Sequence, residues 1–229
     1  MQKKTFYTEL AYLIGVMLLT LGTAMMAAAG LGLSMVIAPA YLLHLKVSHV
    51  LPFFSFGLAD YSLQVVLLAA LMIMLRRVKV SYLFSFVTAI FSSVLLDGAM
   101  FLIGLLPNDT IPVRVLLYLG GLFVSAVGVS LQFHAYICPA AYELFVKDGS
   151  RGLSIPIQKF KTWYDCISCA VGILLSFLFF GFGHFEGISL GTLFCAAVNG
   201  WLIGRCSAFW EKRFVFVDRL PKLKALFDR

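Results

Sequence analysis

The chain has 229 residues, of which 61% are hydrophobic and only 13% are charged. About a quarter of the residues of an ordinary soluble domain are charged, so this composition excludes such a domain and predicts an integral membrane protein. The net charge is +7, but the basic residues lie at the ends of apolar stretches and in the C-terminal tail, where anionic lipid attracts them. We therefore expect the lipid bilayer, and not a nucleic acid, as the partner of these charges.

After a short polar start, about 20 apolar residues lead to Ala29, enough for one helix to cross a hydrocarbon core about 30 Å thick. The three alanines at 27–29 also resemble the cleavage site of a secretory signal peptide. We favour a retained helix, because the apolar run is long for a signal sequence and because cleavage would remove the first member of the repeat described below.

Residues 34–54 stay apolar but are interrupted by two prolines, two histidines and a lysine. Irregular backbone at membrane depth is tolerated only where protein or a watery cavity covers it, so this stretch predicts a short re-entrant or interfacial helix. A second spanning helix is expected over residues 56–75 and a third over 80–106. The third is long enough to need tilt or a break, and a break would fall at Asp97-Gly98.

A short loop with a proline at each end, residues 107–112, separates the chain into two halves. A polar segment also occurs later, over residues 147–161. The tail, residues 209–229, mixes basic with apolar residues and predicts an amphipathic segment on an anionic leaflet. Three further spanning helices are expected, over residues 113–136, 162–182 and 188–208.

One pattern occurs in both halves: an apolar helix stops at small residues and is followed by Pro-Ala-Tyr or Pro-Ala-Ala-Tyr. Such internal similarity indicates repeated structural units, here residues 1–106 and 113–208. The residues that mark the broken helices are Gly30, Gly32, Pro39 and Tyr41 in the first copy and Gly128, Pro139 and Tyr142 in the second.

Three spanning helices per copy is an odd number, so the second copy must enter the membrane from the opposite face. Inverted repeats are a recurrent plan of transporters, with the substrate site near the midplane where discontinuous helices meet. The expected fold is therefore an all-α polytopic membrane protein with six transmembrane helices in two inverted three-helix repeats, each with a broken or re-entrant segment. If the N-terminus is cytoplasmic, Lys46 and Arg114 alone among the 18 Lys and Arg fall outside, so the positive-inside rule places both termini in the cytoplasm.

Several of these stretches resemble the YczE/YitT-type bacterial membrane proteins, and the resemblance covers nearly the whole chain. It implies a multi-pass protein of the bacterial inner membrane, with transport or export as the expected activity. Members carry an aspartate after the broken-helix proline, whereas here Glu143 would have to take its role in the second copy. The residues that carry the resemblance are the Gly-x-Gly-Leu at Gly30, Ser55-Phe56-Gly57, Asp97, and the stretch from Gly187 to Gly200.

Two polar residues lie well inside predicted helices, and each is followed by glycine. Asp97 would cost about 2.5 to 3.5 kcal/mol or more at the bilayer centre, so it is either a proton or cation coupling site or a structural hydrogen-bonding group at a helix break. Asn199 is its candidate counterpart in the second copy, with interhelical hydrogen bonding as the structural alternative.

Further candidates lie near helix ends. Asp60 and Gln64 near the start of the second helix occupy positions similar to those of Lys161 and Asp165 at the start of the fifth, where a spacing of four lets the two side chains pair. These four residues form either a gate or part of the ordinary belt of aromatic and charged residues at the membrane interface. His134, which could titrate near neutral pH, would line a cytoplasmic vestibule with Glu143 or simply be a wet interfacial residue.

The sequence offers little for an enzyme. Gly187-Ile-Ser-Leu-Gly191 matches the serine-hydrolase string, but that string requires a strand-to-helix elbow and a later histidine, and here it opens a predicted membrane helix. No phosphate-binding loop occurs. The five cysteines lie in or beside apolar helices, so neither a metal nor a cofactor is expected.

The sequence thus predicts a transporter of a small organic solute that uses a midplane cavity, with proton or ion coupling through Asp97, and homo-oligomerisation left open. One alternative is the substrate-binding membrane subunit of a vitamin uptake system, docking its ATPase partner complex through Ala24-x-x-x-Ala28. Another is a membrane regulatory protein that transports nothing.

Overall fold

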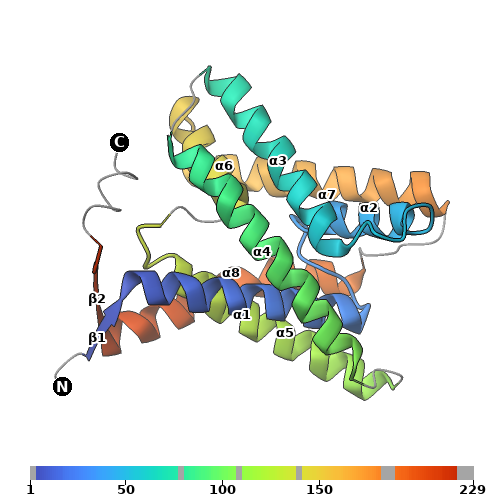
Figure 1. The fold of residues 1–229 in the computed structure, drawn as a ribbon, viewed down its shortest axis with the longest axis horizontal. Coiled ribbons are helices and arrows are strands. Elements are labelled where there is room, and N and C mark those ends of the chain that lie inside the picture. Colours follow the sequence, from blue (N-terminus) through green and yellow to red (C-terminus); the bar gives the residue numbers. More distant parts are fainter. Residues whose placement is uncertain (1–3, 77–79, 107–109, 138–140, 182–188, 221–229) are drawn as a thin grey trace.

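The computed structural model describes residues 4–76, 80–106, 110–137, 141–181 and 189–220, which are mostly helical. The long helices run back and forth between the two ends of the molecule, with α2 and α6 placed between them (Figure 1). The long helices are α1 (Thr8–Ala29), α3 (Phe56–Leu75), α4 (Val80–Gly104), α5 (Ile111–Gln132), α7 (Ile157–Phe180) and α8 (Leu190–Arg213). The shorter elements are α2 (Ala38–Ser48), α6 (Ala141–Gly152), and the strands β1 (Lys4–Tyr7) and β2 (Phe214–Val217).

Five of the described helices are long and apolar enough to cross a membrane, namely α1, α3, α4, α5 and α7. The all-α, multi-pass membrane architecture is therefore confirmed at this level. The helix α8 is equally long, but Asn199 and Arg205 interrupt its apolar sequence and basic residues end it. A sixth crossing by α8 stays a prediction.

The centre of the fold is the antiparallel pair α1 and α5, which approach each other along glycines. A Cβ added to Gly15 would lie 2.8 Å from the carbonyl oxygen of Gly128, and one added to Gly22 would lie 2.5 Å from that of Gly121. Contacts of this length leave no room for a side chain, so glycine lets the two backbones touch. The spacing of seven residues is the same on both helices and keeps the glycines on one face.

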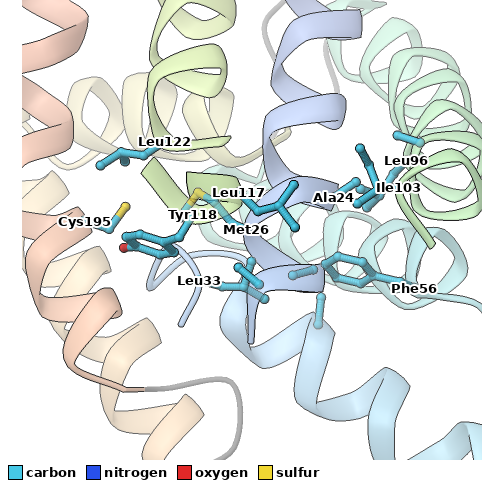
Figure 2. Close-up of a cluster of buried hydrophobic side chains, with 14 residues drawn as sticks. Ala24, Met26, Leu33, Phe56, Leu96, Ile103, Leu117, Tyr118, Leu122 and Cys195 are labelled. Carbon is cyan, nitrogen blue, oxygen red and sulfur yellow. The ribbon is translucent and has the colours of Figure 1, made fainter. Parts of the chain in front are cut away.

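The main hydrophobic core surrounds this pair and includes residues from α1, α3, α4, α5 and α8 (Figure 2). Ala24 of α1 is fully buried in it, beside Leu96 and Ile103 of α4. On the other side, Tyr118 of α5 lies against Cys195 of α8. Ala24 is therefore covered by the chain itself, whereas Ala28 is partly exposed. Docking of an uptake-system partner at this pattern stays a prediction.

Each short helix packs on a long helix from the other half of the chain. α2 packs against α3 and α7, and α6 packs against α7 and α3. The predicted interrupted segments are thus helices, with Pro39 near the start of α2, where its missing N–H leaves no bond unmade. Pro139 lies outside the described residues.

Two local features differ from the sequence prediction. α4 runs without a break through Asp97 and Gly98. The last long helix, expected to end at residue 208, continues as α8 to Arg213, and the next four residues form β2. An amphipathic tail stays a prediction. β2 pairs in parallel with β1 at the N-terminus, so both ends of the described chain lie at the same end of the molecule (Figure 1). The sequence analysis treated both terminal segments as charged ends of apolar helices and did not predict that they pair as strands.

Candidate functional site

A buried polar cluster joins α3 to the start of α6. The Tyr142 hydroxyl donates to Asp60 Oδ1 at 2.6 Å, and Gln64 Nε2 donates to Asp60 Oδ2 at 2.7 Å. The backbone N–H of Ala141 donates to Gln64 Oε1 at 3.4 Å. Asp60 and Gln64 are 6% and 1% exposed, so the carboxyl is shielded from solvent on all sides.

The local sequence explains this placement. Asp60 and Gln64 are four residues apart and therefore share a face of α3, the face that α6 covers. Tyr142 is the second residue of α6 and the last residue of the second broken-helix pattern. The structure thus brings together Asp60, Gln64 and Tyr142, which the sequence predicted as parts of two separate features.

The energetics allow this carboxyl two protonation states. Burial in the protein penalises the charged form of this carboxyl. A hydrogen bond to a charged group contributes about 1.5 to 3 kcal/mol, and Asp60 receives two from neutral donors. Burial and hydrogen bonding therefore act on the protonation of this carboxyl in opposite directions.

A second buried pair fixes α6 to α4. The Tyr82 hydroxyl donates to Asp148 Oδ2 at 2.9 Å, with both residues buried. The sequence analysis missed this pair, since nothing local links residues 66 positions apart. Asp148 stands out only as an acidic residue followed by glycine on the amphipathic helix α6.

The Asp97 side chain accepts hydrogen bonds at the N-terminus of α3. Its Oδ2 accepts from the Ser55 hydroxyl at 2.5 Å and its Oδ1 accepts from the Gly57 N–H at 2.6 Å. Ser55 is itself the N-cap of α3 and accepts from the Leu58 N–H. A carboxylate at a helix N-terminus satisfies orphan N–H groups and the helix dipole, so the structural interpretation of Asp97 fits, although the helix it caps is α3 and not a broken α4.

Asn199 has no corresponding role. Its Oδ1 is buried and has no hydrogen-bond partner among the described residues. It lies on α8, which packs against α5. A buried amide oxygen without a donor is costly, and this cost makes Asn199 a candidate contact for a ligand or a further partner.

The predicted pair on α7 is present. Lys161 Nζ lies 3.6 Å from Asp165 Oδ2, with the lysine side chain 61% exposed. An exposed pair of this kind contributes little stability. Asp165 Oδ1 is buried and lacks a hydrogen-bond partner within the described chain. The structure does not bring this pair into the Asp60 cluster.

His134 lies at the opposite surface from α2, after the C-terminus of α5. Its Nε2 is 3.4 Å from Glu211 Oε1, and its ring stacks on Phe216 of β2 with centroids 4.4 Å apart. It therefore supports the terminal strands and does not contact Asp60. The side chain of Glu143 lies outside the described part of the structure.

The glycine pattern of the first copy contacts the start of α8. The Leu31 carbonyl, between Gly30 and Gly32, accepts from the Gly191 N–H at 3.1 Å and also from the Ser189 hydroxyl. Gly32 has a φ of 119°, which a side chain disfavours, and a Cβ there would be 2.7 Å from the Thr192 nitrogen. Ser189 is also the N-cap of α8 in a capping box with Thr192. The serine of the hydrolase-like string is therefore engaged as a helix cap.

Gly30 ends α1 in the left-handed conformation, with φ 62°. Arg114 of α5 donates to the carbonyl oxygens of Ala29 and Gly30 at 2.7 and 3.3 Å, so one of the two predicted external cations caps a helix. The other, Lys46, donates to the Phe179 carbonyl at the end of α7 at 3.1 Å. Gly128 packs on α1, and Tyr41 packs edge-on against Phe56. Within the described residues, no three His, Cys, Asp or Glu side chains gather as a metal site requires.

Comparison with known proteins gives a family but no activity. No curated protein and no solved structure matches the chain, so its resemblance to YczE/YitT-type proteins stays a prediction. One family model, described as "Family of unknown function (DUF6198)", matches residues 6–208, from β1 to α8. The chain belongs to this DUF6198 family.

Proposed function

We propose that this protein is a multi-pass transporter of a small organic solute, built from two inverted halves that expose a midplane site alternately to each side of the bacterial inner membrane. The observation that carries the proposal is that each short helix packs on a long helix of the other half. α2 of the first half packs against α7 of the second, and α6 of the second half packs against α3 of the first. In transporters with inverted repeats, discontinuous helices at the interface between the repeats typically form the substrate site.

The order of elements supports the inverted repeat. Each half has a long helix, a short helix and two long helices, α1 to α4 and α5 to α8. Several packing pairs also correspond: α1 with α4 matches α5 with α8, and α2 with α3 matches α6 with α7. The packing of α3 on α4 has no counterpart of similar extent between α7 and α8 among the described residues. The central pair α1 and α5 is antiparallel with equally spaced glycines, as two copies related by an axis in the membrane plane would be.

The charges support a cytoplasmic location for both termini. Basic residues follow or end α3, α6 and α8 and begin α7, and β1 lies at that same end of the molecule (Figure 1). At the opposite end, Arg114 and Lys46 bind carbonyl groups of helix termini. A one-sided excess of basic residues favours the cytoplasm for that side.

The packing of each short helix on the other half also suggests how access alternates. α6 lies at the basic end and α2 at the opposite end (Figure 1). Movement of α6 away from α3 would open the basic end, and movement of α2 away from α7 would open the other. The Asp60 cluster lies where α6 meets α3, so it would line the solute path when α6 opens, with Asp60 and Gln64 offering hydrogen-bond acceptors and donors to the solute.

Sided accessibility tests this proposal before any solute has been identified. In a cysteine-free background, Leu63→Cys places a thiol on α3 in the core that contains Tyr142, and Val66→Cys places one on the exposed lipid-facing surface, where the valine is 62% exposed. A charged, impermeant maleimide should modify Leu63→Cys in both right-side-out and inside-out vesicles but should spare Val66→Cys. Modification of Leu63→Cys from one side alone, or from neither, would contradict alternating access.

The rate at which the Leu63→Cys thiol is modified can then be used to identify the solute. A panel of organic acids, amines and amino acids should contain compounds that protect Leu63→Cys, and proteoliposome uptake of a protecting compound would establish transport.

A further inference from the structure

We propose that Asp60 is a proton-binding site whose occupancy controls the packing of α6 on α3. This inference rests on the proposed function only in naming the proton as the coupling ion of transport. The binding site and the movement of α6 are properties of the protein that can be measured without any solute.

The hydrogen bonds identify the oxygen that carries the proton. A backbone N–H can only donate, so the Ala141 N–H fixes Gln64 Oε1 as its acceptor and turns Gln64 Nε2 toward Asp60. Asp60 Oδ2 is therefore an acceptor in either protonation state. Oδ1 faces the Tyr142 hydroxyl, which can donate or accept. The proton resides on Oδ1, and Tyr142 accepts it in a hydrogen bond when the acid is neutral.

The same arrangement favours a proton over a metal cation. Sodium or calcium requires several oxygen atoms that converge on one point. Around Asp60, an amide N–H and a hydroxyl converge instead, and both present hydrogen atoms to the carboxyl group. The Gln64 oxygen, the nearest further acceptor, is turned away toward Ala141.

The neighbouring charges do not supply a counter-cation to Asp60. α3 packs against α2, α4 and α6, and among the described side chains Asp60 has hydrogen bonds to Tyr142 and Gln64 and no ion pair. Asp97 binds the N-terminal turn of α3, one turn before Asp60, and its negative charge opposes a second charge there. Among the described side chains, the titratable or charged ones on the helices packed against α3 are Tyr41, His44 and Lys46 on α2, Tyr82 and Asp97 on α4, and Tyr142, Asp148 and Arg151 on α6. The sequence of α6 also contains Glu143 and Lys147, whose side chains lie outside the described part of the structure.

Proton release and helix movement are therefore linked. With α6 packed on α3, water is excluded and the neutral acid is favoured, because burial penalises the charged form. When α6 moves away, Tyr142 and Ala141 leave with it, water reaches Oδ1, and the carboxyl releases its proton to that water. By linkage, acid favours the packed position of α6 and alkali favours its separation from α3.

Spin labels can measure this movement in reconstituted full-length protein. One label replaces exposed Arg151 on α6 and the other replaces exposed Phe123 on α5. In the otherwise wild-type protein, the distance distribution should shift toward a second, separated population as the pH is raised. Asp60→Asn mimics the neutral acid and should hold the packed distance at every pH. The infrared band of a protonated carboxylic acid, lost on titration of wild-type protein, should be absent from the titration difference spectrum of Asp60→Asn.

Two further variants keep the test decisive. Tyr142→Phe removes the hydrogen bond to Oδ1 but leaves the carboxyl, so it should retain the infrared titration while its separated population increases. Asp148→Asn is the matched control, because it alters the other buried tyrosine–aspartate pair of α6, and its distances should still respond to pH. A pH response that persists in Asp60→Asn, or that Asp148→Asn abolishes, would overturn the proposal. So would a wild-type spectrum with no titrating carboxyl attributable to Asp60.

Failure here is distinguishable from failure of the transport proposal. If Leu63→Cys is accessible from both sides while Asp60→Asn keeps the pH response, the protein alternates without a proton site at Asp60. If the Asp60 titration and the movement of α6 are found but Leu63→Cys is accessible from one side alone, the proton switch exists and alternating access does not.

Discussion

Asp97 and Asn199 occupy similar sequence positions in the two halves but differ in their hydrogen bonding. Each lies inside the last long helix of its half and is followed by glycine. Asp97 is fully engaged, holding the first turn of α3 through Ser55 and Gly57. Asn199 has a buried oxygen with no donor among the described residues. Similar sequence positions therefore have different surroundings: the carboxylate of Asp97 stabilises a helix start, whereas the Asn199 oxygen has no donor within the described chain.

The largest effect is expected where α3 touches α4. Gly57→Ala would place a methyl group against the backbone carbonyl of Ser93 and the carboxyl carbon of Asp97, and the backbone oxygen cannot yield as a side chain would. We expect destabilisation of about 3 kcal/mol, measured as the free energy of unfolding in detergent micelles. The matched control is Gly98→Ala, where nothing lies within 4 Å. A Gly57→Ala protein as stable as Gly98→Ala would contradict the close packing of α3 on α4.

Replacement of Asp97, which holds the first turn of α3, should lower the free energy of unfolding slightly less than Gly57→Ala does. Asp97→Ala leaves the Gly57 N–H without its acceptor and removes a charge from the N-terminus of α3, with an expected loss of about 2 kcal/mol. Asp97→Asn keeps an acceptor oxygen and should lose about half as much. Thermal denaturation of the two variants in the same detergent distinguishes these values. Equal losses would show that the charge, and not the hydrogen bond to Gly57, stabilises α3.

The N-cap serine should contribute less than the carboxylate that binds it. Ser55→Ala removes the acceptor for the Leu58 N–H and the donor to Asp97. The expected destabilisation is about 1 kcal/mol, typical of a lost helix cap. In a double-mutant cycle with Asp97→Ala the two effects should be less than additive, because the residues bond to each other. Strict additivity would argue that the Ser55–Asp97 bond contributes nothing.

The smallest effect on stability is expected in the second half. Asn199→Ala removes a buried oxygen that has no described partner, so the free energy of unfolding should change by less than about 0.5 kcal/mol or should rise. Gly200→Ala, with nothing within 4 Å, is the neighbouring control. If Asn199 instead contacts a ligand, the variant should lose solute protection of Leu63→Cys while its stability is kept. A loss of stability as large as that of Asp97→Ala would mean that Asn199 stabilises the fold after all.

The sequence predicted most of the helices because their length and apolar composition are set by the bilayer. It also selected Asp60 and Gln64 as polar residues near a helix start, and Tyr142 as part of the repeated proline pattern. It assigned coupling to Asp97 because depth alone does not reveal a hydrogen-bond partner. Ser55, with a helix following at once, carried a recognisable N-cap signal that could have suggested the helix start that Asp97 stabilises.

The remaining errors concern contacts between distant residues. Tyr82 and Asp148 meet because α4 and α6 pack together, and a separation of 66 residues leaves no local sequence signal for the contact. The strand β2 has a recognisable sequence, Phe214-Val-Phe-Val217, rich in residues that favour strands. Its partner β1, Lys4-Thr-Phe-Tyr7, also contains strand-favouring residues but is only four residues long. Only the folded helices bring the two together, so neither segment alone could predict the pairing.

That pairing has a consequence for biosynthesis. Lys4 pairs with Phe214, and Thr8 donates to Asp218 across 210 residues of chain. At about 5 to 20 residues per second, the ribosome needs about 10 to 40 s to produce the second strand after the first. The N-terminal strand therefore waits without its partner while all the helices are inserted, and closure of the two ends is among the last events in the maturation of the polypeptide.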